Sequence, residues 1–82
     1  MDEAEFDLLD ELYFVTSFSE LRANTEMSET KIQNTLVSLA SKGWICVYEN
    51  SEEEVAEFDL ISNFKSYFYL ASKKGLLAHN KQ

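Results

Sequence analysis

Apolar residues recur at spacings of three and four through the first part of the chain, which is the period of an amphipathic helix. This pattern predicts a first helix over residues 4–15 and a second over residues 18–24. Thr16 and Ser17 interrupt the pattern and offer N-cap oxygens for the second helix. The side chains expected on the inner faces are Phe6, Leu9, Leu12 and Tyr13 in the first helix, and Phe18, Leu21 and Ala23 in the second.

The cleanest helical stripe lies between two turn signals, Ser28 and Gly43. Ser28 is a good N-cap residue, although Lys31 stands where a capping box would have Glu. Lys42 complements the dipole at the end of this third helix, and Gly43 is well placed to stop it in the left-handed conformation. The inner stripe of the helix, which we expect over residues 28–42, is Ile32, Leu36, Leu39 and Ala40.

After Gly43 the helical spacing gives way to short apolar runs rich in aromatic and β-branched residues, which favour strands. Two such runs predict strands over residues 44–48 and 66–71. Between them, residues 55–60 alternate like a strand, yet their apolar residues spaced by three also fit a short helix. Periodicity therefore leaves the segment 50–66 open as strand, helix or loop.

The last stretch, residues 72–80, predicts a short C-terminal helix with Leu76 and Leu77 packed inward. A chain of 82 residues has room for one core, so residues 1–82 are expected to form a single domain. The predicted class is α+β, with a three-helix core, a small antiparallel sheet and the short final helix.

Charge is strongly segregated along the chain. The formal net charge is -8, from 15 acidic and 7 basic residues. All the carboxylates lie in residues 2–29 and 49–59, and four of the lysines follow residue 60. DNA-binding domains usually present a basic face, so any such face here must be local and modest.

Few residues suggest catalytic or metal chemistry. Cys46 is the only cysteine and stands in an apolar run, so we expect a small core residue rather than a reactive thiol. His79 is the only histidine, and its place near the C-terminus predicts a frayed, solvent-exposed position. Without metal-ligand spacing, a nucleophile constellation or a glycine-rich phosphate loop, we expect no enzyme activity, metal or cofactor.

The N-terminal residues are acidic with a short apolar stretch, which is unlike a secretory signal peptide. No apolar run approaches the roughly 20 residues that a membrane-spanning helix needs. The chain is therefore expected to be cytoplasmic, without a membrane partner.

Residues 18–45 resemble the winged helix-turn-helix superfamily. The resemblance rests on an SEL helix at Ser19, a turn that ends in Ser28, an aliphatic residue at Ile32, and the run LxxLxxKGWI that begins at Leu36. The segment YLASKKGLLAHN, residues 69–80, is similar to the strand and helix that close the wing in MarR-like regulators.

The resemblance implies a small, dimeric transcriptional regulator whose third helix meets duplex DNA. Asn and Gln side chains can pair with adenine, and Lys can donate to guanine or phosphate. The residues carried over as base-reading contacts are Thr30, Lys31, Gln33 and Asn34, and the possible phosphate contacts are Lys65, Lys73 and Lys74.

The alternative is a protein-interaction module without direct DNA contact. The carboxylates of residues 52–54 would stand near a wing that normally approaches the phosphates, and their charge opposes DNA binding. A dense aromatic cluster must partly fill the core, and the remainder could pad a homodimer interface. Its members are Phe58, Phe64, Tyr67, Phe68 and Tyr69.

Overall fold

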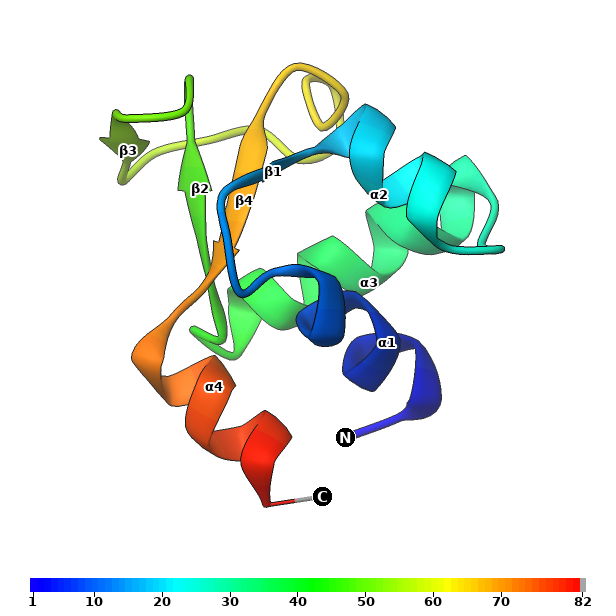
Figure 1. Ribbon diagram of the computed structural model, residues 1–82. Helices are drawn as coiled ribbons and strands as arrows, with labels where there is room; N and C mark the ends of the chain where they lie inside the picture. The colour runs from blue at the N-terminus through cyan, green and yellow to red at the C-terminus, as the bar shows by residue number, and fades with distance from the viewer. Residues whose placement is uncertain (82) are drawn as a thin grey trace.

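The computed structural model describes residues 1–81, in which helices and an antiparallel sheet are combined (Figure 1). The α+β class predicted from the sequence is confirmed. In chain order the elements are α1 (Glu3–Glu11), β1 (Thr16–Ser17), α2 (Phe18–Asn24), α3 (Glu29–Ser41), β2 (Ile45–Tyr48), β3 (Glu54–Val55), β4 (Phe68–Ala71) and α4 (Lys73–Asn80).

The strands form one sheet in the order β1-β4-β2-β3, with every neighbouring pair antiparallel. Between β2 and β4, Ile45 lies opposite Ala71 and Tyr48 lies opposite Phe68. Successive side chains of a strand point to opposite faces, so each strand buries every second residue. The buried set is Ile45, Val47, Tyr69 and Ala71, and the half-buried set on the outer face is Cys46, Tyr48, Phe68 and Leu70.

Helices α1, α2 and α3 lie on one side of β2 and β4, and α4 packs beside the end of β4 and against α1 (Figure 1). The core forms where the three helices meet the inner face of the sheet. Burial of these side chains is the main stabilising term of so small a domain. The fully buried aliphatic residues are Leu8, Leu9, Leu12, Leu21, Ile32, Leu36 and Leu39.

Each helix begins at a polar residue whose side chain accepts a hydrogen bond from the first turn. Ser28 caps α3 through the backbone N–H of Lys31 at 3.1 Å, as the sequence predicted. Ser17 caps α2, as the sequence predicted, and Glu20 completes a capping box with it. Gly43 ends α3 with a φ of 72°, which confirms its predicted left-handed conformation.

Helix α1 ends at Glu11, four residues before the predicted boundary at residue 15. The carbonyl of Leu12 accepts a hydrogen bond from the backbone N–H of Ala71 at 2.8 Å, so the chain leaves the helix to join the end of β4. Tyr13 then lies outside the helix and is 43% exposed rather than packed inward. The predicted inner residues Ala23 and Leu77 are also exposed, because α2 and α4 turn those faces to solvent.

The expectation for His79 was wrong, because α4 docks on α1 and leaves this side chain only 8% exposed. Its ring stacks on Phe6 at a centroid distance of 4.3 Å, and its Nδ1 lies 2.8 Å from the Tyr13 hydroxyl. Nε2 has no hydrogen-bond partner and lies 3.6 Å from a carboxylate oxygen of Asp10.

Gly75 allows α4 to approach the start of β2 closely. A Cβ at this position would lie 2.0 Å from the carbonyl oxygen of Trp44, so no larger residue fits without movement. The same carbonyl accepts a hydrogen bond from the backbone N–H of Ser72, the N-cap of α4.

The segment that periodicity left open contains the two-residue strand β3 and then a series of turns. Asp59 shapes the first turn, because its Oδ1 accepts hydrogen bonds from the backbone N–H groups of Ile61 and Ser62. The hydroxyl of buried Tyr69 donates to the carbonyl of Phe64 and so holds the segment that leads into β4. The flanking strands are shorter than predicted, because Trp44 and residues 66–67 lie outside the sheet.

Candidate functional site

The first half of α3 carries the predicted base-reading residues, and three of them lie on the surface. Thr30, Lys31 and Asn34 are exposed. Gln33 is half-buried, and its Nε2 donates to the carbonyls of Leu60 at 3.0 Å and Ile61 at 3.2 Å. Gln33 therefore fastens the 58–61 segment to α3. Its amide nitrogen is already hydrogen-bonded, so the side chain is not free to pair with a DNA base.

Lys31 stands in acidic surroundings. It borders a shallow hollow whose other walls come from α1 and from the turn before α3. Glu3 and Asp7 are two of these lining residues, and both are exposed carboxylates. Their proximity reduces the positive potential that Lys31 could offer to an anion.

Lys65 lies beside the start of α3, where its Nζ is 3.2 Å from a carboxylate oxygen of Glu29. The same ammonium group lies over the ring of Phe64, 5.9 Å from its centroid. The side chains of Lys65 and Glu29 are 59% and 48% exposed, so the stabilising effect of the ion pair is small. The pair nevertheless cancels the charge of the predicted phosphate contact nearest to α3.

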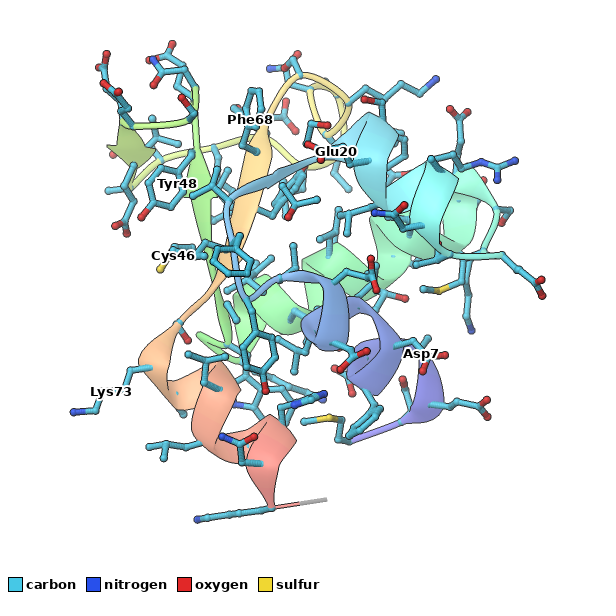
Figure 2. The ribbon with its side chains drawn as sticks, viewed as in Figure 1. Asp7, Glu20, Cys46, Tyr48, Phe68 and Lys73 are labelled. Carbon is cyan, nitrogen blue, oxygen red and sulfur yellow. The ribbon has the colours of Figure 1, made fainter. Side chains whose placement is uncertain are left out.

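Lys73 and Lys74 are not gathered with the other predicted contacts. They begin α4, which packs against α1 and β4. Figure 2 shows Lys73 projecting from the opposite end of the molecule to the start of α3. The predicted DNA-contact set is thus divided between two distant surfaces.

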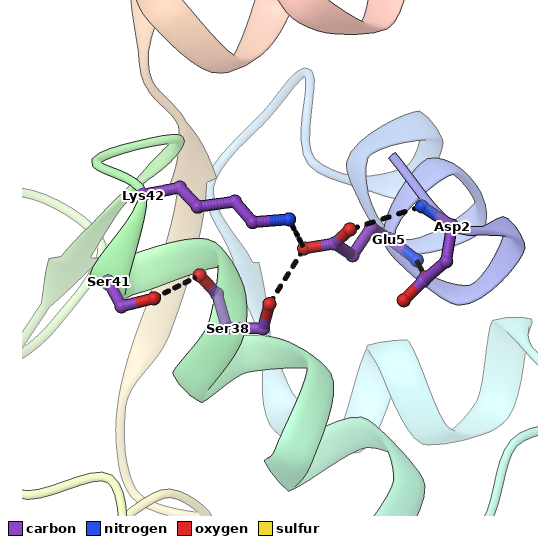
Figure 3. Close-up of polar contacts among 5 residues, drawn as sticks. All are labelled: Asp2, Glu5, Ser38, Ser41 and Lys42. Carbon is purple, nitrogen blue, oxygen red and sulfur yellow. Dashed lines mark hydrogen bonds and ion pairs between the residues drawn. The ribbon is translucent and has the colours of Figure 1, made fainter.

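Lys42, expected to complement the α3 dipole, is instead drawn inward by a buried carboxylate. Its Nζ lies 2.7 Å from Oε2 of Glu5, a residue only 2% exposed (Figure 3). The hydroxyl of Ser38 donates to the same oxygen at 2.8 Å, and the backbone N–H of Asp2 donates to the other. Burial acts to raise the pKa of Glu5, but these hydrogen bonds outweigh it and hold the pKa below 4.5.

An apolar groove of about 460 Å³ runs along the second half of α3. The sequence had not predicted this groove. Ile61 is 71% exposed, and Phe58 and Val37 are each more than a third exposed. We call this surface the α3 groove; its lining residues are Val37, Ala40 and Ser41 from α3, and Phe58, Asp59, Leu60 and Ile61 from the facing segment.

The lining of the α3 groove is negatively charged. Asp59 is its one charged lining residue, and none of the lining residues is Lys or Arg. The backbone N–H groups of Ser62 and Ile61 lower the pKa of Asp59, so its carboxylate stays charged. Sequence reasoning missed this surface because it left the segment 50–66 unassigned, and nothing local places Phe58 beside α3.

Within residues 1–81, no group of three His, Cys, Asp or Glu side chains has the arrangement needed to hold a metal ion. Among these residues there is also no helix with the length and apolar character required to cross a membrane. No protein-family model, curated protein or solved structure matches this chain.

Proposed function

We propose that the protein is a winged-helix interaction module that binds a protein segment, rather than DNA, through the α3 groove. The winged-helix assignment is supported by the chain order, in which α2 and α3 are joined by a short turn and followed by β2 and β4. It is also supported by the sheet, where β4 returns between β1 and β2. The turns of residues 56–67 and β3 then occupy the place of the wing.

The observation that carries the proposal is the apolar character of the α3 groove. Small monomeric proteins expose apolar side chains singly, whereas contiguous exposed groups usually mark an interaction site. Val37, Phe58 and Ile61 are exposed together on the groove walls. A helix laid in such a groove would bury its apolar side chains there.

The cations around α3 argue against DNA as the ligand. Phosphate contacts supply most of the sequence-independent affinity for DNA, and they require accessible Lys or Arg side chains. Lys42 is paired with buried Glu5 and Lys65 is paired with Glu29. Lys31 remains exposed but lies close to carboxylates of α1.

The same charges indicate the chemistry of the partner. Asp59 lines the α3 groove, and the adjacent Glu57 is exposed. A segment with apolar anchors flanked by Lys or Arg would complement both the groove and its acidic border. We therefore propose a basic amphipathic helix as the bound segment.

The proposal can be tested by titrating the ¹⁵N-labelled protein with a model peptide of leucine and lysine in helical repeat. A second peptide of equal charge, with serine in place of leucine, measures attraction by charge alone. We expect the leucine peptide to shift the amides of Val37, Ala40 and Ile61. The serine peptide should leave them unchanged.

Ile61→Asp should weaken binding of the leucine peptide by about tenfold, because it places a carboxylate on the apolar wall. Leu77→Asp is the matched control, since Leu77 is also exposed but lies on α4. The proposal fails if both peptides act alike or if both variants behave alike. It also fails if a random-sequence DNA duplex binds with a steep salt dependence and Lys31→Glu weakens that binding.

A further inference from the structure

Six large apolar side chains are exposed within residues 1–81, and they form two groups. One group lines the α3 groove: Val37, Phe58 and Ile61. The other comes from α4 and from the loop after α1: Leu77, Tyr13 and Phe14. Figure 1 shows α4 beyond the end of β4, whereas the turns of residues 56–67 lie at the start of that strand. The second group therefore marks a surface apart from the groove.

Leu77 lies at the centre of the outward face of α4. Successive helical residues are about 100° apart, so residues 73, 77 and 81 form one stripe, while Gly75 and His79 point to the buried side. The exposed residues of this stripe and its margins are Lys73, Lys74, Leu77, Asn80 and Lys81. We call this set the α4 face.

Tyr13 borders the α4 face, and Phe14 follows it in the same loop. The Tyr13 hydroxyl lies 3.2 Å from Oδ1 of Asn80, which places the tyrosine at the margin of this face. The carbonyl of Phe14 accepts a hydrogen bond from the Thr16 hydroxyl at 2.7 Å, while its side chain is 80% exposed. A loop held by hydrogen bonds therefore adds exposed apolar surface beside the α4 face.

The α4 face is a basic surface on an acidic protein. Residues 60–82 contain no carboxylate, although the net charge of the chain is -8. Two carboxylates from other elements limit this surface. Asp10 lies 3.6 Å from Nε2 of buried His79, and the charge of Glu54 adds to burial in raising the pKa of Cys46 in β2. Within residues 1–81 neither carboxylate forms an ion pair with a lysine of the α4 face, so all three ammonium groups remain open to a partner.

We infer that the α4 face binds an acidic amphipathic helix of a partner protein. A helix lying along α4 would place an apolar side chain against Leu77. Carboxylates one turn before and after that side chain would meet Lys73 and Lys81, since residues four apart share a helix face. Opposite charges on both sides of an apolar contact fix its register and favour association.

This inference does not depend on the function proposed for the α3 groove, because no groove residue takes part. It extends that function, since the two surfaces select partners of opposite charge. The protein would then act as an adaptor that holds a basic segment at the groove and an acidic segment at α4.

A nucleic acid fits the α4 face less well than an acidic helix. Its affinity comes mainly from phosphates that Lys or Arg neutralise, and this face offers three lysines on a chain of net charge -8. A helix with a few carboxylates needs no more cations than these, and it also buries Leu77.

A titration of the ¹⁵N-labelled full chain with a model peptide of leucine and glutamate in helical repeat tests the inference. A second peptide of equal charge, with serine in place of leucine, measures attraction by charge alone. We expect the leucine peptide to shift the amides of Leu77 and Tyr13 and to leave those of Val37 and Ile61 unchanged. The serine peptide should bind at least about tenfold more weakly.

Lys73→Glu with Lys81→Glu should weaken binding of the leucine peptide by at least about tenfold. The matched control is Lys31→Glu with Lys65→Glu, because it makes the same change in net charge at exposed lysines outside the α4 face. This control pair should have little effect.

Leu77→Gln keeps the charge and a good helix former, and it should weaken binding about fivefold, whereas Ile61→Gln should not. The comparison of the two peptides uses the unaltered chain, so it stands even where a substitution disturbs α4. The inference is overturned if the leucine peptide shifts no α4 amide, if the two peptides bind alike, or if the two lysine pairs behave alike. It is also overturned if a single-stranded oligonucleotide displaces the leucine peptide and shifts the same amides.

Discussion

Helix α1 is held by α3 on one side and by α4 on the other, and the two contacts are built differently. Toward α3, Glu5 is buried, yet its carboxylate is met by Lys42, Ser38 and a backbone N–H. Toward α4, His79 is buried by stacking on Phe6, and its Nε2 has no hydrogen-bond partner. A satisfied polar group costs little in a core, whereas an unsatisfied one lowers stability.

This difference indicates which junction should open first. The α1–α3 contact joins two helices that also share the main aliphatic core. The α1–α4 contact depends on an aromatic stack and the Tyr13 hydroxyl, and α4 is otherwise held by the close approach of Gly75 to Trp44 at the start of β2. We therefore expect α4 to be the least stable helix. Three substitutions test the difference in stability between the contacts of α3 and those of α4.

Gly75→Ala should have the largest effect. The added methyl group would lie 2.0 Å from a backbone oxygen, so α4 must shift away from β2 at a cost of about 3 kcal/mol. Urea denaturation followed by tryptophan fluorescence measures the loss, because Trp44 is at the contact. The control is Gly43→Ala, where the φ of 72° is unfavourable but the space is open, and about 1 kcal/mol is expected. Equal losses would show that α4 does not pack closely against the backbone of Trp44.

Lys42→Met should come next, with a loss on the order of 2 kcal/mol at neutral pH, because a buried carboxylate loses its cation. The loss should shrink in acid. The lowered pKa of Glu5 means that its contribution to stability is complete above 4.5 and disappears as the pH falls toward the folded-state value. Denaturation at neutral pH and below that value measures both effects, with Glu5→Gln as the comparison. A loss independent of pH would contradict the role of the ion pair.

Tyr13→Phe should have the smallest effect, about 1 kcal/mol, because it removes the hydroxyl that contacts Nδ1 of His79 and the side chain of Asn80. Amide hydrogen exchange should show faster opening of α4 while α3 is unchanged. Tyr48→Phe serves as the control, since it removes the hydroxyl of a half-buried tyrosine in β2 rather than one that contacts α4. Equal acceleration in α3 and α4 would mean that α4 opens only with the whole domain.

The sequence predicted the elements whose causes are local. The Ser28 cap, the buried positions of Ile32, Leu36 and Leu39, and the left-handed Gly43 follow from neighbouring residues, and all were confirmed. Ala40, the last residue of the predicted stripe, is half-buried and lines the α3 groove. What it missed depends on contacts between distant segments. Glu5 and Lys42 are 37 positions apart, and His79 is buried only because α4 docks on α1.

The candidate site was predicted less well than the fold. Thr30, Lys31 and Asn34, which were carried over from the resemblance, are exposed. The hydrogen bonds that occupy Gln33, and the groove beside Val37, depend on where the 58–61 segment returns. Periodicity left that segment open, so it could not show that apolar side chains would stand beside α3.

The hydrogen bonds of Gln33 and Tyr69 have a consequence for binding at the α3 groove. Gln33 fastens the groove wall to α3, and Tyr69 fastens the chain that follows it to the core. The groove wall is therefore already in position before a ligand binds. Binding would cost little conformational entropy for ordering this wall. Gln33→Ala changes no apolar groove residue, yet it should weaken binding, because ordering of the 58–61 segment would then oppose association.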